Sequence, residues 1–302
     1  MLHSPATAPD KRRAFRAALE SGDLVRMPGA VNPLTALSIQ RAGFEGVYVS
    51  GAVLSADLAL PDIGLTTLTE VTARAQAIAR VTDLPTLVDA DTGFGEPLNV
   101  ARTIQSLEDA GLAGCHIEDQ VNPKRCGHLD GKTVVSEADM LRRIRAAVDA
   151  RRDPGFVVCA RTDIRAIDGL GAAIDRAKAY ADAGADLIFP EALANAAEFE
   201  AVRSAVDVPL LANMTEFGTS TLLTADTLRD LGINAVIYPV TLLRIAMGAI
   251  TGALDRIAAD GTQAALVEDM QTRAELYDLL GYADYAKFDT AVFSHTAHGE
   301  QP

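Results

Sequence analysis

A short polar run, Lys124-Arg125-Cys126-Gly127-His128, places one thiol among cations and an imidazole. Positive neighbours favour the thiolate form of a cysteine. A cysteine in such surroundings can take up or release a proton near neutral pH. The run follows His116-Ile117-Glu118-Asp119-Gln120, which has the pattern of a buried strand that ends in polar residues. We therefore interpret Cys126 as a candidate acid or base in a loop after a strand.

A second group of candidate residues is acidic. Asp89 and Asp91 are two residues apart at the end of an apolar run, so their side chains share one face of a strand. With Glu118 and Glu191, they form an oxygen-rich set that suits Mg²⁺, which needs only one or two direct carboxylates. Zinc is disfavoured, because nitrogen and sulfur ligands are few here. Some of these acids could instead cap helices, but for the Asp89 and Asp91 pair a metal is the better interpretation.

Cationic and amide side chains follow other strands. Arg161 and Arg244 could each bind a carboxylate through a bidentate fork, and Asn213 adds an amide. Either arginine alone is more simply explained by a salt bridge to a neighbouring acid. Their joint placement favours a pocket for a small polycarboxylate. Ser50-Gly51-Ala52 offers backbone N–H groups and a hydroxyl to the same kind of ligand, which alone is a weak signal.

The elements that position these residues repeat along the chain. Short apolar runs bounded by Gly, Pro or Asp alternate with Ala-rich amphipathic stretches, a pattern typical of strands and helices. Strands are predicted at residues 24–27, 46–50, 86–90, 114–118, 156–161, 187–190, 210–213 and 235–238, and helices at 68–81, 98–110, 138–150 and 172–183. Eight such units favour a (β/α)8 TIM barrel, whose active site lies at the carboxyl ends of the strands. No Gly-x-Gly-x-x-Gly run follows the first strand, so a dinucleotide fold lacks support.

The ends of the chain differ from this repeat. Residues 1–302 are interpreted as a single barrel domain, with 1–9 as a loose tail rich in Pro, Ser and Thr. Helical patterns at 241–259 and 262–280 follow the last strand, although the barrel needs only one helix to close. We expect residues 262–302 to form a helical extension that packs on a neighbouring subunit.

Composition limits the classes of partner. The net charge of −14 over 302 residues argues against nucleic acid, and it disfavours an anionic membrane surface. No stretch has the pattern of a transmembrane helix. Three cysteines without the spacing of a disulfide framework fit a reducing cytoplasm. The expectation is therefore a cytoplasmic protein whose partner is a small molecule.

The run from Lys124 to His128 resembles the signature loop of the isocitrate lyase and phosphoenolpyruvate mutase superfamily. Its lysine-arginine form is similar to that of the members that cleave 2-methylisocitrate. The resemblance covers nearly the whole chain. It includes residues 48–51, 60–62, 89–95, 116–120, 160–163, 189–191, 213–218 and 270–273.

The resemblance implies a metal and substrate site. Asp89 would bind Mg²⁺ directly, while Asp62, Asp91 and Glu118 would hold its waters. Cys126 would be the general acid, and Tyr48 is a candidate base. The substrate, a small tricarboxylate, would be bound by Ser50, Gly51, Arg161, Glu191, Asn213, Thr215 and Arg244, joined by Gly127 and His128 when the loop closes. Ala52 stands where relatives have a glycine, and it still offers its N–H group to the substrate.

The implied reaction is cleavage of 2-methylisocitrate to pyruvate and succinate, in the methylcitrate cycle of propionate catabolism. The implied assembly is a homotetramer in which the last barrel helix is exchanged between subunits. Phe189 and Ile237 are expected to line an apolar niche for the methyl group. The near alternative is an isocitrate lyase or another lyase of the superfamily. A catalytically inactive barrel that acts as a binding protein is the alternative outside enzymes.

Overall fold

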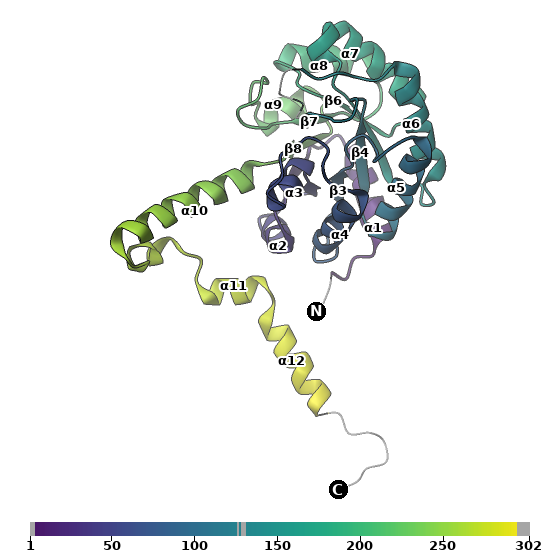
Figure 1. The fold of residues 1–302 in the computed structure, drawn as a ribbon. Coiled ribbons are helices and arrows are strands. Elements are labelled where there is room, and N and C mark those ends of the chain that lie inside the picture. Colours follow the sequence, from purple (N-terminus) through teal and green to yellow (C-terminus); the bar gives the residue numbers. More distant parts are fainter. Residues whose placement is uncertain (1–3, 126, 128–130, 295–302) are drawn as a thin grey trace, which may run out of the picture.

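Eight parallel strands close into a (β/α)8 barrel in the computed structural model, which describes residues 4–125, 127 and 131–294 (Figure 1). The strands are β1 (Val25–Pro28), β2 (Val47–Val49), β3 (Thr86–Asp89), β4 (Gly114–Glu118), β5 (Val157–Thr162), β6 (Leu187–Pro190), β7 (Leu211–Asn213) and β8 (Ala235–Tyr238). Pairing runs β2-β3-β4-β5-β6 in one sheet and β1-β8-β7 in another. Parallel bridges from Gly29 to Tyr48 and from Ile188 to Leu210 join the two sheets. The predicted barrel is confirmed, with every strand end within one residue of its expected position.

Alternate residues of each strand point to opposite sides of the barrel wall. Met27, Tyr48 and Phe189 belong to an interior cluster, which α1 (Ala8–Glu20) completes with Phe15. Val49, Ile117 and other outward residues pack beneath the surrounding helices. A two-residue side-chain period therefore divides the apolar residues into two layers. These two apolar layers do not occupy the carboxyl ends of the strands, where polar side chains lie instead.

Helices follow the strands and cover most of the outer wall of the barrel. They are α2 (Pro33–Arg41), α3 (Gly51–Asp57), α4 (Leu68–Ala79), α5 (Pro97–Asp109), α6 (Glu137–Ala150), α7 (Arg165–Asp182), α8 (Ala196–Ala205) and α9 (Ala225–Asp230). Side-chain caps fix several starts: Thr67 accepts from the Glu70 backbone, and Asn195 accepts from that of Glu198. The predicted helix at 172–183 begins earlier, at Arg165, and contains a kink at Gly169.

Residues 4–9, which belong to the expected loose tail at 1–9, are held by a helix cap and by a contact with the barrel. Helix α1 begins at Ala8, and Thr7 caps it in a capping box with Asp10. The Ser4 backbone donates to the Arg80 carbonyl over 3.2 Å. The cap was readable from the Thr-x-x-Asp spacing, whereas the contact with Arg80 depends on the fold.

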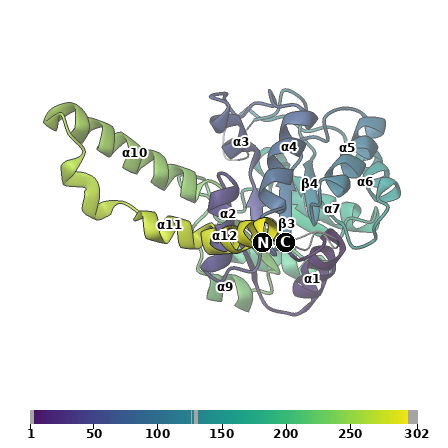
Figure 2. The same ribbon diagram turned by 90° about the horizontal axis from the view of Figure 1, so that it is seen from below.

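The chain after β8 leaves the barrel as an extended arm (Figures 1 and 2). Helix α10 (Thr241–Asp260) has no buried residue. The single helix expected at 262–280 is wrong: a 3-10 turn (Ala264–Asp269) precedes α11 (Arg273–Leu279), and α12 (Tyr282–Phe293) follows. The break arises because Met270 is extended and Thr272 starts a new helix through a capping box with Glu275. Within the described residues, no helix is both long and apolar enough to cross a membrane.

Candidate active site

A cavity of about 90 Å³ lies at the carboxyl ends of the strands. It brings together most residues that the sequence singled out: Tyr48, Ser50, Ala52, Asp62, Asp89, Gly127, Arg161, Glu191, Asn213, Thr215 and Arg244. Lys124, Phe189 and Ile237 also line it. Cys126 and His128 lie outside the described residues. The strand-end positions therefore converge as a barrel requires.

Asp89 is a carboxylate of the acidic group that accepts hydrogen bonds from two backbone N–H groups. The backbone N–H of Gly51 donates to its Oδ2 over 3.2 Å, and that of Asp91 donates to its Oδ1 over 3.0 Å. Burial opposes ionisation, but His116, which is protonated only at the low pH where Asp89 titrates, and the cations Lys124 and Arg161 outweigh it and lower the pKa of Asp89 to about 2. For Asp91, burial and the nearby Asp89 charge raise the pKa to about 6. Asp89 is thus the member of the pair that holds negative charge most firmly.

The ammonium of Lys124 lies among the acids that the sequence assigned to a metal. Its Nζ forms an ion pair with Asp62 and lies 2.8 Å from Asp91 Oδ1. Burial disfavours the charge, but Asp89, Asp91, Glu118 and Asp62 together raise the pKa of Lys124. This arrangement could not be predicted from the sequence, because Lys124 and Asp62 are far apart along the chain.

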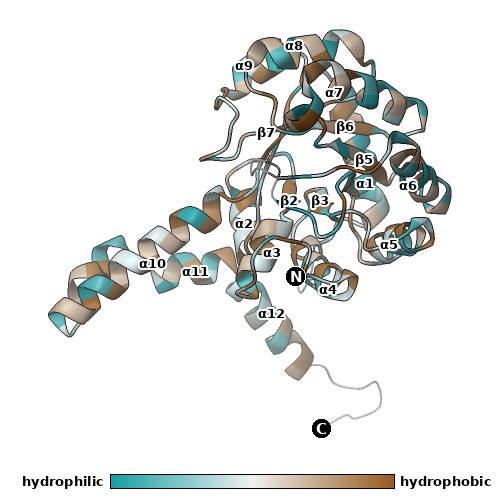
Figure 3. Cartoon of the chain, turned by 45° about the horizontal axis from the view of Figure 1, so that its top comes forward, coloured by the Kyte–Doolittle hydropathy of each residue, from teal (hydrophilic) through white to brown (hydrophobic). Residues whose placement is uncertain are grey.

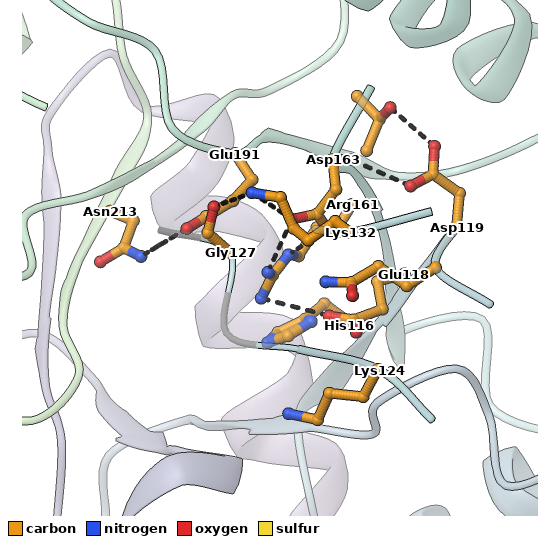
Figure 4. Close-up of polar contacts among 12 residues, drawn as sticks. His116, Glu118, Asp119, Lys124, Gly127, Lys132, Arg161, Asp163, Glu191 and Asn213 are labelled. Carbon is orange, nitrogen blue, oxygen red and sulfur yellow. Dashed lines mark hydrogen bonds and ion pairs between the residues drawn. The ribbon is translucent and has the colours of Figure 1, made fainter. Parts of the chain in front are cut away.

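Arg161 is held between two carboxylates (Figure 4). Its Nε and Nη2 donate to Asp163 over 3.0 and 3.1 Å, and its Nη1 lies 3.2 Å from Glu118 Oε2. The guanidinium also lies over the Phe189 ring, 5.2 Å from its centroid. Burial raises the pKa of Glu118 well above its ordinary value, although the Arg161 charge opposes this. Asp163 was not predicted to have a role, and it fixes the direction of the arginine fork.

Glu191 and Asn213 line the cavity at the ends of β6 and β7. The Asn213 amide nitrogen donates to Glu191 Oε1 over 3.2 Å. Arg244 lines the same cavity but lies at its rim, where its Nη1 donates to the Glu216 carbonyl over 2.7 Å and to Glu216 Oε2 over 2.8 Å. The expected convergence of Arg161 and Arg244 is therefore present, with the second guanidinium partly exposed to solvent.

Tyr48 and His116 form a buried pair close to Asp89. The Tyr48 hydroxyl lies 2.7 Å from His116 Nε2, and that nitrogen lies 3.5 Å from Asp89 Oδ1. Burial lowers the pKa of His116 to about 4, so the imidazole is neutral at neutral pH. Burial and the Asp89 charge raise the pKa of Tyr48. The pair can share a proton, whereas an isolated Tyr48 phenolate is disfavoured.

Gly127 lies so close to the cavity wall that no side chain fits. A Cβ atom there would be 2.5 Å from Arg161 Nη2 and 2.5 Å from Glu191 Oε1. The backbone at Gly127 therefore lies directly against the side chains of Arg161 and Glu191. The segment between β4 and α6 is anchored at its base, where Gln120 bridges Val134 and the Val121 N–H donates to the Thr133 carbonyl over 2.9 Å.

Asp119, for which the sequence offered no metal role, is a buried anchor beneath the site. Its Oδ2 accepts from the Thr162 hydroxyl over 2.7 Å, from Arg176 Nη1 over 2.7 Å and from the Tyr180 hydroxyl over 2.8 Å. Its Oδ1 accepts from the Asp163 backbone over 2.9 Å. Asp119 thus ties the ends of β4 and β5 to α7. The polar end of strand four was readable from the sequence, but its partners on α7 were not.

The donor set fits a magnesium ion. Among the described residues, no three His, Cys, Asp or Glu side chains converge tightly enough to bind a metal by direct contact alone. Mg²⁺ keeps several waters and takes one or two carboxylates directly, so a looser set suffices. Neither carboxylate oxygen of the buried Glu118 accepts a hydrogen bond in the described part of the chain, although Oε2 forms an ion pair with Arg161. Asp62 and Asp91 already form ion pairs with one cation, the ammonium of Lys124, and the charges of Asp89 and Glu118 also favour its protonated form.

The sequence model of the phosphoenolpyruvate phosphomutase family matches residues 15–258. This chain belongs to that family. Its match extends from α1 through nearly all of α10, so it includes every strand-end residue of the cavity. The resemblance inferred from the loop sequence is therefore confirmed at the level of the phosphomutase family.

Named relatives and solved structures within this family are similar to the chain over most of its length. A protein of Corynebacterium glutamicum named probable 2-methylisocitrate lyase 2 is 64% identical over 302 residues, which is 100% of this chain and 98% of the relative. The 2-methylisocitrate lyase of Escherichia coli is 46% identical, over 94% of this chain and 95% of its own length.

The structural relatives include other phosphomutase-family enzymes. The crystal structure of 2,3-dimethylmalate lyase has a TM-score of 0.89 and 34% identity, and the match covers 99% of this chain and 100% of that chain. A phosphonopyruvate hydrolase in complex with oxalate and Mg²⁺ has a TM-score of 0.84 and 32% identity, covering 93% and 98%. Different reactions therefore occur on this fold, and the side chains in the cavity must distinguish them.

Proposed function

We propose that this protein is a cytoplasmic, Mg²⁺-dependent carbon–carbon lyase that cleaves 2-methylisocitrate to pyruvate and succinate, in the methylcitrate cycle of propionate catabolism. One observation carries the proposal. A cavity that combines Asp89 with Arg161 occurs in a chain 64% identical, over its whole length, to a probable 2-methylisocitrate lyase. Carboxylates suited to a divalent cation and a guanidinium suited to a carboxylate are the chemistry that a tricarboxylate substrate requires.

Binding of the substrate follows from the cavity lining. Arg161 binds one carboxylate of the substrate, and Arg244 approaches from the rim. Ser50, Gly51, Ala52, Gly127, Asn213 and Thr215 supply backbone and side-chain hydrogen bonds, with His128 completing the set and Glu191 orienting the amide of Asn213. Phe189 and Ile237, both buried, line the cavity beside these polar groups and form the apolar niche for the methyl group.

Asp89 would hold the metal directly, and Asp91, Asp62 and Glu118 would hold it through water. Bound Mg²⁺ supplies Lewis-acid stabilisation of oxygen and a template for the substrate. The chain's own part is to keep Asp89 ionised, which the Gly51 and Asp91 N–H groups favour. Lys124 must give up part of its contact with Asp91 or share that carboxylate when the ion binds.

Proton transfers are assigned to Tyr48 with its partner His116 and to Cys126. Tyr48 removes the proton of the 2-hydroxyl group while its own proton passes to His116, 2.7 Å away. The C2–C3 bond then breaks, pyruvate leaves as the ketone, and the electron pair stays on the succinate fragment. Cys126 protonates that fragment and forms no bond to carbon. Arg161 stabilises the carboxylate charge that develops during cleavage.

We infer that the assembly is a homotetramer in which α10 is exchanged between subunits. Helix α10 exposes Ile245, Met247, Ile250, Leu254 and Ile257, each at least 40% accessible. Figure 3 shows that hydrophobic and hydrophilic residues are mixed along the ribbon of α10. A largely apolar groove of about 510 Å³ lies between α2 and α9 beside β1 and β8, with Ile39, Phe44 and Tyr238 in its lining. A helix from a second copy would cover both apolar surfaces at once.

Light scattering coupled to gel filtration tests the assembly. Wild-type protein should be tetrameric, and Leu254→Glu should reduce the mass of the particle, because it places a charge on the apolar face of α10. Leu98→Glu changes another exposed leucine, on α5, and should leave the tetramer intact. A monomeric wild type would contradict helix exchange.

Product analysis tests the reaction. Purified protein with Mg²⁺ and 2-methylisocitrate should form pyruvate and succinate in equal amounts, and Cys126→Ser should nearly abolish this while succinate binding persists. Full activity of Cys126→Ser would refute the acid role. Binding of succinate without any turnover by the wild type would favour the alternative of an inactive barrel, and equal turnover of isocitrate would favour an isocitrate lyase.

A further inference from the structure

Lys132 belongs to the segment between β4 and α6, yet its side chain is buried against Gly127, which lines the cavity. The side chain is 3% exposed. Its ammonium donates a hydrogen bond to the Gly127 carbonyl and lies 3.7 Å from Asp163 Oδ1 (Figure 4). Burying an ammonium is costly unless partners compensate for the lost water. Among the described residues, Lys132 contacts a backbone carbonyl of its own segment and a carboxylate just after the end of β5.

Asp163 is itself rigidly placed. Its side chain is completely buried, and both of its oxygens accept from Arg161. Its backbone N–H donates to Asp119 Oδ1 over 2.9 Å, and Asp119 is fixed by Arg176 and Tyr180 of α7. The partner of Lys132 on the barrel side is therefore the same carboxylate that aims the substrate-binding guanidinium.

We propose that Lys132 is a positioning residue that couples the backbone at Gly127 to the Arg161–Asp163 pair, an inference that rests on the function proposed above. The Lys132 ammonium contacts the carbonyl of Gly127, the residue after Cys126. The same ammonium lies near the Asp163 carboxylate that orients Arg161. Without it, the Gly127 backbone and the Arg161 fork can shift independently. Displacements of about 1 Å in a reacting geometry can lower a rate about 10²-fold.

A purely structural role does not explain this placement. The segment is already attached at its base by the Gln120–Val134 bridge, and the Arg125 N–H donates to Gln120 Oε1 over 2.8 Å. Lys132 is not needed for that attachment. Its removal should therefore leave the fold in place and affect the local order of the backbone near Gly127.

The experiment compares Lys132→Met with Lys132→Arg and with Lys178→Met, which changes an exposed lysine of α7. Steady-state rates for 2-methylisocitrate are measured with Mg²⁺, and amide exchange of the peptide that contains Gly127 is measured without substrate. Lys132→Met should lower kcat at least about ten-fold and change KM less than about three-fold. Its exchange at that peptide should be faster, while its melting temperature stays near that of the wild type. Lys132→Arg should recover part of kcat, and Lys178→Met should match the wild type.

Wild-type kcat and wild-type exchange in Lys132→Met would overturn the proposal. A loss of kcat that accompanies a fall in melting temperature, with unchanged exchange near Gly127, would also overturn it, because the residue would then act through stability. If the wild type does not cleave 2-methylisocitrate, the proposed function fails. The exchange comparison still decides whether Lys132 orders the backbone at Gly127.

Discussion

Lys124 Nζ lies 2.8 Å from Asp91 Oδ1, inside the group of acids assigned to magnesium. The same ammonium pairs with Asp62, and its side chain is 3% exposed. The Lys124 ammonium and a bound divalent cation would therefore interact with the same carboxylates, those of Asp62 and Asp91. The charge balance of the site consequently depends on Lys124 when no metal is bound.

Replacing Lys124 with Met should destabilise the metal-free protein by about 3–5 kcal/mol, because removing one partner leaves buried carboxylates uncompensated. Added Mg²⁺ should restore much of this loss, because the ion supplies the missing positive charge. Denaturant unfolding in EDTA and then in Mg²⁺ measures both effects. The neighbouring Arg125→Met removes the same charge from an exposed side chain and should be nearly neutral. An equal response of the two variants to Mg²⁺ would contradict this account.

Tyr48→Phe should lower kcat by about 10²–10⁴-fold, the range for loss of a general base. The substitution removes only the hydroxyl that lies 2.7 Å from His116 Nε2, so Mg²⁺ binding should be retained. Single-turnover kinetics and calorimetry separate these effects. Tyr238→Phe removes a hydroxyl from β8 beside the outer groove and serves as the control. Undiminished turnover by Tyr48→Phe would assign the base elsewhere.

Gly127→Ala should lower kcat by about 10²-fold, because its Cβ would lie 2.5 Å from Arg161 Nη2 and force the backbone or the guanidinium to move. Gly171→Ala provides the matched control: it lies in α7 with no atom within 4 Å of the added methyl group. That change should keep full activity and add about 0.5–1 kcal/mol of stability. Wild-type kinetics in Gly127→Ala would mean that the segment adopts another position during turnover.

Asp119→Ala should reduce the free energy of unfolding by about 3–5 kcal/mol, because it leaves the partly buried Arg176 guanidinium without its carboxylate. The exposed i,i+4 pair of Arg145 and Asp149 offers a comparison, in which Asp149→Ala should cost at most about 0.5 kcal/mol. Urea unfolding measures both values. Similar losses in the two variants would show that the Asp119 network has little net effect on stability.

The barrel could be predicted because its pattern is local. Each strand is a short apolar run, and the run of Ile117 ends in the polar Glu118 just as the rule for barrel active sites requires. The arm was harder to predict: the start of α11 depends on the Thr272 capping box, and the apolar residues of α10 look the same whether their partner is the barrel or another subunit.

The site could be predicted where residues terminate strands, as Asp89 and Arg161 do. It could not be predicted where a contact joins distant parts of the chain. Lys124 to Asp62 and Lys132 to Asp163 are long-range ion pairs, and lysine and aspartate are common on any protein surface. Only the fold shows that these four side chains point inward.

The most direct test of the proposed function is a steady-state comparison of 2-methylisocitrate, isocitrate and oxaloacetate in the presence of Mg²⁺. A methyl group in an apolar niche contributes about 1–3 kcal/mol of discrimination. With Phe189 and Ile237 lining the cavity, kcat/KM for 2-methylisocitrate should exceed that for isocitrate by about 10–200-fold, with oxaloacetate lower still. Equal values for the first two substrates, or no cleavage of 2-methylisocitrate, would contradict the account.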